Sequence, residues 1–268
     1  MSDDKQAVQD YWNVASCGEA LYLSNIDNVG YEAQAKKRYE LEPYIESFAQ
    51  FAGAYGRAVL EVGVGLGADH ERFASSGALL SGVDLTQRAV EHTLHRLTGR
   101  GLTSQLQVAD AENLPFSNDH FDIVYSWGVL HHSPNTPKAV NEVWRVLRSD
   151  GSARIMVYHK YSIVGYMLWL RYALLIGRPW RSLSEVYSHH LESPGTKAYS
   201  IDEARKLFAR FARVEIKTVL THGDLLSSDV GQRHRGMILS IARAIWPRWL
   251  IRILLPKHGL FLLITAVK

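Results

Sequence analysis

Between residues 57 and 158, short apolar runs of strand length alternate with stretches whose apolar residues recur at helical spacing. Strands are predicted at 58–62, 79–83, 106–108, 121–126 and 154–158. The helix between the last two strands, for example, places Val140, Val143 and Leu147 on one face. Repeated strand–helix units joined by short turns predict a parallel sheet that helices cover on both faces.

Local signals predict where three of the helices begin. Thr86 can cap a helix that follows the second strand, and Pro137 stands at the first position of another. Ser200 and Glu203 have the spacing of a capping box, in which each side chain binds the backbone N–H of the other residue. These signals place the helices between the strands, as a strand–helix–strand fold requires.

The alternation stops twice, at 159–199 and at 221–258, and strand patterns return at 213–218 and 260–267. Both insertions leave from carboxyl ends of strands, the edge at which open α/β sheets bind ligands, so we expect two helical lids. The pattern of residues 1–56 predicts a helical cap that is rich in aromatic side chains. The sequence therefore predicts one domain over 1–268: cap 1–56, cofactor-binding core 57–158, first insertion 159–199, returning sheet 200–220 and 259–268, and second insertion 221–258.

The composition limits which partners and which cell compartment are expected. The 268 residues are 47% hydrophobic and 21% charged, with a net charge of +3, which is too weakly basic to predict a nucleic-acid partner. The lone Cys17 excludes an internal disulfide and favours a reducing, cytoplasmic location. The polar first residues give no secretory signal, and the apolar stretch after Ile163 is interrupted by Arg171, well short of the ~20 apolar residues of a membrane span.

The run from Val59 to Gly67 indicates chemistry, because a strand ends there in the pattern Glu61-x-Gly63-x-Gly65-x-Gly67. Glycines at such a turn let the backbone approach a nucleotide-like ligand. An acid at the end of the second strand, Asp84, can accept two hydrogen bonds from a ribose diol. These features fit either a dinucleotide or S-adenosylmethionine.

Three details favour the methyl donor. A carboxylate at Glu61 attracts an ammonium group and would repel a pyrophosphate at the same turn. Asp110, after the third strand, can accept a hydrogen bond from an adenine amino group. The fourth strand ends in an aromatic side chain, Trp127, followed by two imidazoles.

Five ordered segments between about Arg57 and Tyr158 resemble class I S-adenosylmethionine-dependent methyltransferases, and are similar to the small-molecule branch typified by quinone-biosynthesis enzymes. The segments are the glycine turn, Gly82-Val83-Asp84, Asp110-Ala111-Glu112-x-Leu114-Pro115-Phe116, Leu130-His131-His132 and Leu147-Arg148-x-x-Gly151. The resemblance implies a Rossmann-like seven-stranded α/β sheet, mostly parallel, with the last strand antiparallel.

The resemblance also implies roles for individual residues in binding the cofactor. Glu61 and the three turn glycines Gly63, Gly65 and Gly67 would lie at the methionine and ribose, with Asp84 and Leu85 at the ribose. Asp110 and Ala111 would border the adenine, and Ser126 and Trp127 would border the reacting methyl group.

Methyl transfer from a sulfonium is an in-line displacement that depends largely on positioning and exclusion of water. A weakly acidic acceptor also needs a general base, for which His131, His132, His159 and Tyr158 are candidates at strand ends. No group of ligands has a clear metal spacing along the chain, so no metal is predicted. His189, His190 and Glu192 are interpreted as a solvated polar loop.

The composition of the two insertions indicates which class of acceptor the protein could bind. Residues 161–180 and 237–255 mix apolar and aromatic residues with arginines. They fit a lid over an apolar acceptor, an amphipathic surface that touches anionic lipid, or helices packed on the sheet. We expect O- or C-methylation of a small, apolar or aromatic acceptor. The alternatives are a nicotinamide-dependent oxidoreductase, or a non-catalytic protein that binds a cofactor or a membrane surface.

Overall fold

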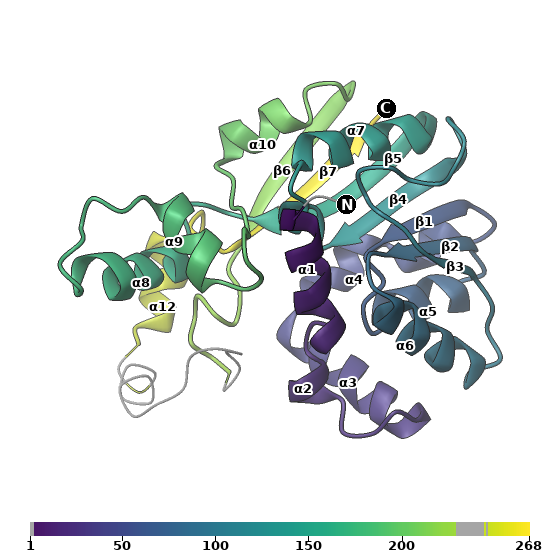
Figure 1. Cartoon of the computed structure of the whole chain (residues 1–268), viewed down its shortest axis with the longest axis horizontal. Helices are drawn as coiled ribbons and strands as arrows, with labels where there is room; N and C mark the ends of the chain where they lie inside the picture. The colour runs from purple at the N-terminus through teal and green to yellow at the C-terminus, as the bar shows by residue number, and fades with distance from the viewer. Residues whose placement is uncertain (1–2, 229–243, 245) are drawn as a thin grey trace.

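The computed structural model describes residues 3–228, 244 and 246–268, and a seven-stranded sheet with strand order β3-β2-β1-β4-β5-β7-β6 lies at its centre (Figure 1). Neighbouring strands from β3 to β5 pair in parallel, whereas β7 runs antiparallel to both β5 and β6. This arrangement confirms the predicted Rossmann-like sheet with an antiparallel last strand. The strands are β1 (Ala58–Val62), β2 (Leu79–Asp84), β3 (Gln105–Val108), β4 (Phe121–Trp127), β5 (Leu147–Tyr158), β6 (Arg213–Val219) and β7 (Phe261–Val267).

Helices cover the sheet and its carboxyl edge. Thr86 accepts a hydrogen bond from the N–H of Ala89, and Ser200 and Glu203 form the reciprocal capping box, as predicted. Asn135 caps the helix whose first turn contains Pro137. Outside the insertions the helices are α1 (Asp3–Val14), α2 (Glu19–Tyr22), α3 (Asn28–Leu41), α4 (Tyr44–Ala49), η1 (Phe51–Ala54), α5 (Ala68–Ser75), α6 (Gln87–Thr98), η2 (Leu130–His132), α7 (Thr136–Val146) and α10 (Ile201–Leu207).

The core lies on both faces of the sheet, because alternate strand residues point to opposite sides. On one face Leu60 of β1 joins a cluster with Val143 of α7 and Phe208 after α10. On the other face Val59, the preceding residue, packs with Phe73 of α5 and the N-terminal helices. Burial on both faces holds β1 and β4 rigidly, so the loops at their carboxyl ends have a fixed base.

The described parts of the two insertions form one lobe beside the sheet, made of α8 (Ile163–Trp169), η3 (Leu170–Leu174), α9 (Leu183–His190) and α12 (Arg248–Leu254) (Figure 1). Ile163, Leu225 and Ile251 share a buried cluster that joins the insertions. Helix α8 begins at Ile163, ends at Trp169 and continues as the π-helical turn η3. The predicted apolar positions 237–243 and 245 lie outside the described residues.

No helix in the described ranges is both long enough and apolar enough to cross a lipid bilayer.

Candidate functional site

A cavity of about 1110 Å³ lies at the carboxyl edge of the sheet, between the N-terminal helices, the strand ends and the lobe. Nine of the ten residues predicted to bind the cofactor line it: Glu61, Gly63, Gly65, Gly67, Asp84, Leu85, Asp110, Ala111 and Trp127. The tenth, Ser126, is fully buried and donates a hydrogen bond to the Val62 carbonyl at 2.8 Å, so it fastens β4 to β1 instead of facing the cavity.

The glycine turn after β1 has the geometry that its sequence predicts. Gly63 and Gly65 have φ values of 86° and 52°, in the left-handed region that favours glycine. A Cβ on Gly63 would lie 2.1 Å from the Val129 side chain, so only glycine fits there. A Cβ on Gly65 would meet no atom within 4 Å, so Gly65 borders the open space of the cavity. The turn therefore presents bare backbone to a ligand.

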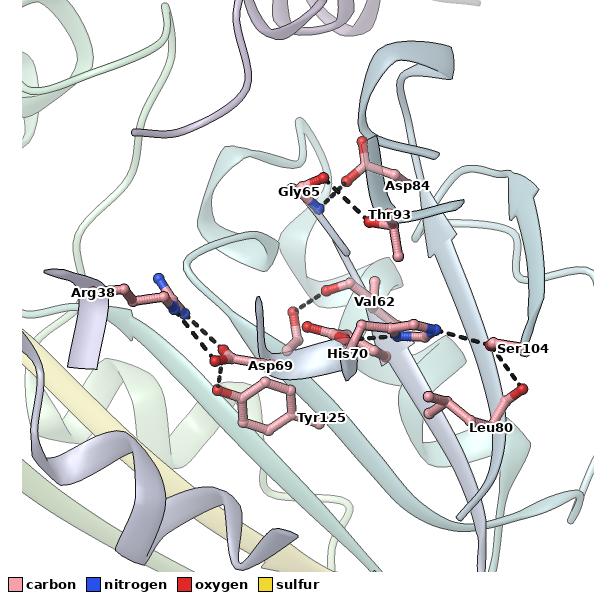
Figure 2. Close-up of polar contacts among 12 residues, drawn as sticks. Arg38, Val62, Gly65, Asp69, His70, Leu80, Asp84, Thr93, Ser104 and Tyr125 are labelled. Carbon is pink, nitrogen blue, oxygen red and sulfur yellow. Dashed lines mark hydrogen bonds and ion pairs between the residues drawn. The ribbon is translucent and has the colours of Figure 1, made fainter. Parts of the chain in front are cut away.

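Asp84 stands beside this turn at the end of β2 (Figure 2). One carboxylate oxygen accepts hydrogen bonds from the Thr86 N–H and hydroxyl at 3.0 and 2.9 Å, and the other accepts from the Gly65 N–H at 3.2 Å. These bonds orient the carboxylate and leave acceptor capacity on Oδ2 for a ribose hydroxyl. Together with the open space at Gly65, this acid fits an adenosine cofactor.

Glu61 is buried behind the turn and pairs with a histidine. Its Oε2 lies 2.8 Å from Nδ1 of His70, whose Nε2 lies 2.8 Å from the Ser104 hydroxyl (Figure 2). Ser104 donates to the Leu80 carbonyl, so its oxygen accepts from His70 Nε2–H, and Nδ1 in turn accepts from Glu61. Burial raises the pKa of Glu61 and lowers that of His70 to about 3, so the pair is neutral with its proton on Glu61.

The sequence reasoning missed a second acid beside the turn, Asp69 in the first turn of α5. Arg38 of α3 binds its carboxylate with two nitrogens, at 3.2 and 2.6 Å, and the Tyr39 and Tyr125 hydroxyls donate at 3.0 and 2.8 Å (Figure 2). Burial alone would raise the pKa of Asp69, but the Arg38 charge and these hydrogen bonds outweigh it and lower that pKa. The network fixes the N-terminal helices to the cofactor turn.

Asp110 lines the cavity, yet its carboxylate is already engaged. Lys5 of α1 contacts Asp110 at 2.5 Å and Glu112 at 2.8 Å. Glu112 also accepts hydrogen bonds from the loop before α7. Burial opposes ionisation of Glu112, but these donors outweigh it and lower its pKa to about 2. Helix α1 is thereby held over the part of the cavity where the adenine is expected.

Trp127 closes the cavity beside the strand ends. Its ring stacks on those of Tyr44 and Tyr125, with centroids 6.0 and 6.5 Å apart and interplanar angles of 23° and 20°. The Arg38 guanidinium lies 5.9 Å from its centroid. These contacts fix the indole, so it forms a rigid wall where the reacting methyl group is expected.

The three predicted catalytic histidines differ in their access to the cavity. His131 is fully buried off the cavity, and neither of its ring nitrogens has a hydrogen-bond partner among the described residues. His159 is also buried off the cavity and donates from Nδ1 to the Gly259 carbonyl at 3.1 Å. Burial lowers the pKa of both imidazoles. Neither reaches a ligand in the cavity, and His132 is the one of the three that lines it.

A cluster around Glu192 supplies the polar chemistry at this part of the cavity. The Tyr158 hydroxyl donates to Glu192 Oε2 at 2.7 Å, and His132 Nε2 lies 3.3 Å from the same oxygen. Nδ1 of His132 lies 2.8 Å from the Ser193 hydroxyl. The Glu192 side chain is 20% exposed against 5% for His132, so the carboxylate is the accessible group of the cluster. Glu192 thus belongs to the site and not to a solvated loop.

His131, His132 and Glu192 each offer one atom within 4.8 Å of the others, a spacing compatible with a metal ion. The sequence could not predict that these three residues lie close together, because Glu192 belongs to an insertion and the two histidines do not. The prediction that the protein binds no metal stays a prediction.

Glu42, at the end of α3, is another acid of the cavity wall that the sequence did not single out. Its carboxylate lies 3.3 Å from Arg38. Burial raises the pKa of Glu42 to about 7, with Arg38 opposing that shift. A group that titrates near neutrality therefore faces the ligand space.

The far wall of the cavity is apolar and comes from the insertions. The side chains of Val164, Met167, Leu168 and Leu191 line it, and Leu226 and Trp246 line it from the second insertion. The cavity exceeds the ~300–1,000 Å³ usual for a small-molecule site, so it has room for a second ligand beside a cofactor.

A family model described as a methyltransferase domain matches residues 60–155. The ubiquinone biosynthesis O-methyltransferase of Haemophilus ducreyi is 28% identical over 130 residues, which cover 47% of this chain and 54% of that enzyme. A methyltransferase of Bacillus subtilis, YcgJ, is 37% identical over 94 residues, 35% of this chain and 37% of that protein. The chain spans about half the length, or less, of these curated relatives.

The matched segment contains the glycine turn, Asp84 and Asp110, so the shared sequence coincides with the cofactor half of the cavity. A structural neighbour, phosphoethanolamine N-methyltransferase 2 of Haemonchus contortus, aligns over 100% of this chain and 60% of its own with a TM-score of 0.65. At 16% identity this likeness shows the fold alone. Residues 60–155 are a methyltransferase domain of the S-adenosylmethionine-dependent class, and S-adenosylmethionine is the cofactor that this domain implies.

Proposed function

We propose that the protein transfers a methyl group from S-adenosylmethionine to an oxygen or carbon of a small, apolar or aromatic acceptor. One observation carries the proposal: a single cavity joins the glycine turn and Asp84 to the apolar wall of the insertions. A cofactor held at the turn and an acceptor held against the lobe would therefore meet inside one space that excludes bulk water.

The described residues fit the cofactor in named roles. The backbone at Gly65 would approach the methionine and ribose, and Asp84 would bind the ribose diol. When bound, S-adenosylmethionine supplies a methyl group on a sulfonium, which the acceptor takes with its own electron pair. Trp127 and the cavity wall orient the two partners and exclude water.

We further propose that Glu192 accepts the proton that an O–H or C–H acceptor loses. His132 lies 3.3 Å behind the carboxylate and can share that proton, while Tyr158 holds the carboxylate from the side. The predicted catalytic role of His132 is thereby refined: His132 positions and supports Glu192, which itself reaches the cavity.

The first experiment tests the cofactor and the acceptor class together. We would measure S-adenosylmethionine and NAD binding by titration calorimetry, then offer labelled S-adenosylmethionine with phenols, quinols and lipid-linked sugars. We expect the methyl donor alone to bind, and label to enter one of the apolar acceptors. Tight NAD binding without S-adenosylmethionine binding would support the oxidoreductase instead. Cofactor binding without transfer to any acceptor, or to any ligand that copurifies with the protein, would support the non-catalytic alternative.

The second experiment tests the base once an acceptor is known. Glu192→Gln keeps the size of the side chain and the hydrogen bond from Tyr158, but it cannot take a proton. We expect the single-turnover rate to fall about 100-fold or more with cofactor affinity unchanged. Glu185→Gln, an equal change at an exposed position of α9, is the control and should match the wild type. An unchanged rate and pH profile in Glu192→Gln would refute this role.

A further inference from the structure

The lobe carries two groups of exposed apolar side chains, which we together call the lobe face. One group lies on or just after η3 and the other on α12, and their side chains expose between 45% and 73% of their area: Leu174, Leu175, Ile176, Trp249, Ile253 and Leu254. So many exposed apolar side chains on one lobe indicate an interaction site.

The same helices already have buried sides of their own. Ala173 in η3 is fully buried, and Ile251 in α12 is 6% exposed. Ile251 packs with Ile163, and Ala173 packs with Leu168 and Val186, in the two small cores of the lobe. The lobe face is therefore a second apolar side that packing within the described residues does not use.

The charged residues on the two segments that carry the lobe face have one sign. Residues 161–183 and 246–258 contain six basic residues and no acidic one. Arg171 lies in η3 and Arg178 follows it, whereas Arg252 lies in α12 and Lys257 follows that helix. Basic side chains beside exposed tryptophan and leucine complement a bilayer interface with anionic headgroups, where apolar groups enter the acyl boundary and cations stay at the phosphates.

The cavity extends to the part of this face that lies near η3. Leu175 is 73% exposed on the lobe face and also lines the cavity, as do its neighbours Leu170 and Arg171. From these contacts we propose that the lobe face docks on anionic phospholipid bilayers, so that an apolar acceptor enters the cavity from the bilayer without crossing water. The docking rests on the lobe alone, whereas the delivery of an acceptor rests on the proposed function.

The test is flotation of the full chain with vesicles of phosphatidylcholine, with and without phosphatidylglycerol. We expect the wild type to float with the anionic vesicles at low salt and to be released as salt screens the charges. Trp249→Glu combined with Ile253→Glu should lower the partition coefficient about tenfold or more, because it places charge where apolar groups enter the bilayer.

The control adds the same two charges away from the lobe. Val29→Glu combined with Leu94→Glu changes exposed apolar positions on α3 and α6, and should float like the wild type. Unchanged S-adenosylmethionine affinity in both double variants shows that they fold. A wild type that stays unbound at low salt, or an equal loss in both variants, would overturn the proposal.

Two further outcomes separate this proposal from its alternatives. A wild-type dimer that the Trp249 and Ile253 substitutions dissociate, without vesicle binding, would assign the lobe face to a second copy of the chain and overturn membrane docking. Flotation that depends on the lobe face, in a protein that methylates no acceptor, would sustain docking while the proposed function fails.

Discussion

The ion pair between Arg38 and Asp69 is the contact that connects the N-terminal helices to the cofactor turn, and it can be tested by a double-mutant cycle. Arg38→Met removes the guanidinium and keeps the apolar stem of the side chain. Asp69→Asn removes the charge and keeps an oxygen that can accept from Tyr39 and Tyr125. The double variant completes the cycle.

The expected loss of unfolding free energy follows from the burial of the two charged side chains. The Arg38 side chain is 23% exposed and that of Asp69 is 3% exposed, so either single variant leaves a largely buried charge without its partner. Breaking a buried pair costs about 3–5 kcal/mol of unfolding free energy. We expect about 3 kcal/mol for each, because Tyr39 and Tyr125 still donate to Asp69, and Glu42 still faces Arg38. The double variant should lose about 2 kcal/mol less than the sum of the two.

Thermal unfolding by circular dichroism gives the measurement. At about 2–4 °C per kcal/mol for a domain of roughly this size, each single variant should lose about 6–12 °C in Tm. Arg205→Met removes an exposed pair with Asp202 and should change stability by about 0.5 kcal/mol at most. Single variants whose Tm stays within about 2 °C of the wild type would refute the reasoning.

The pH dependence supplies an independent check with a defined sign. The folded-state pKa of Asp69 lies below its ordinary value of 3.8, so its contribution to stability is present above that pH and is lost as the pH falls through the folded-state pKa. The difference in unfolding free energy between the wild type and Asp69→Asn should therefore shrink as the pH falls below about 4. A difference that persists unchanged below about pH 4 would contradict this assignment.

Two further predictions concern ligands. Asp84→Ala should weaken S-adenosylmethionine binding about 100-fold in calorimetry, since it removes the carboxylate that would accept a charge-assisted hydrogen bond from the ribose. Gly65→Arg should abolish binding by filling the open space at the turn. Gly101→Arg, at another left-handed glycine with open space around it, is the control for backbone strain, and undiminished affinity in both site variants would count against the cofactor site. Chelation with EDTA should leave cofactor binding unchanged, because the glycine turn and Asp84 lie outside the cluster of His131, His132 and Glu192. It should leave methyl transfer unchanged as well, because the proposed proton acceptor, Glu192, needs no metal to take a proton. Activity that EDTA removes and Zn²⁺ restores would instead establish a metal at the cluster.

The sheet and the cofactor half of the site were predictable because their signals are local. Alternating apolar runs predict buried strands, and closely spaced glycines directly after such a strand predict a tight turn that a ligand can approach. Gly65 and Asp84 lie 19 residues apart, but parallel pairing of β1 and β2 brings their chain ends together in any fold of this class. The orientation of Ser126 could not be predicted, because a strand residue can face either side of the sheet and only the completed sheet shows which.

The N-terminal helices were harder to place. Nothing in the sequence near Arg38 or Lys5 indicates which acid each will meet, since Asp69 and Asp110 lie 31 and 105 residues away. Charged residues on a helix usually face solvent, so the pattern alone favours that interpretation. Pairs of this kind form when a cap folds back over the sheet, and they become visible only once its docking is known.

Glu192 shows how an insertion can bring a functional side chain to the cavity although its position along the chain does not indicate this. After α9, the chain returns along the end of β5, where the Lys197 N–H donates to the His131 carbonyl and the Tyr199 N–H donates to the Tyr158 carbonyl. These backbone bonds hold the returning segment against η2 and the end of β5, and thereby bring Glu192 to His132 and Tyr158. Under the proposed function, the sheet would position the cofactor, and the first insertion would supply the proton acceptor that faces it. We therefore expect exchange of residues 159–199 and 221–258 to change the acceptor without moving the cofactor.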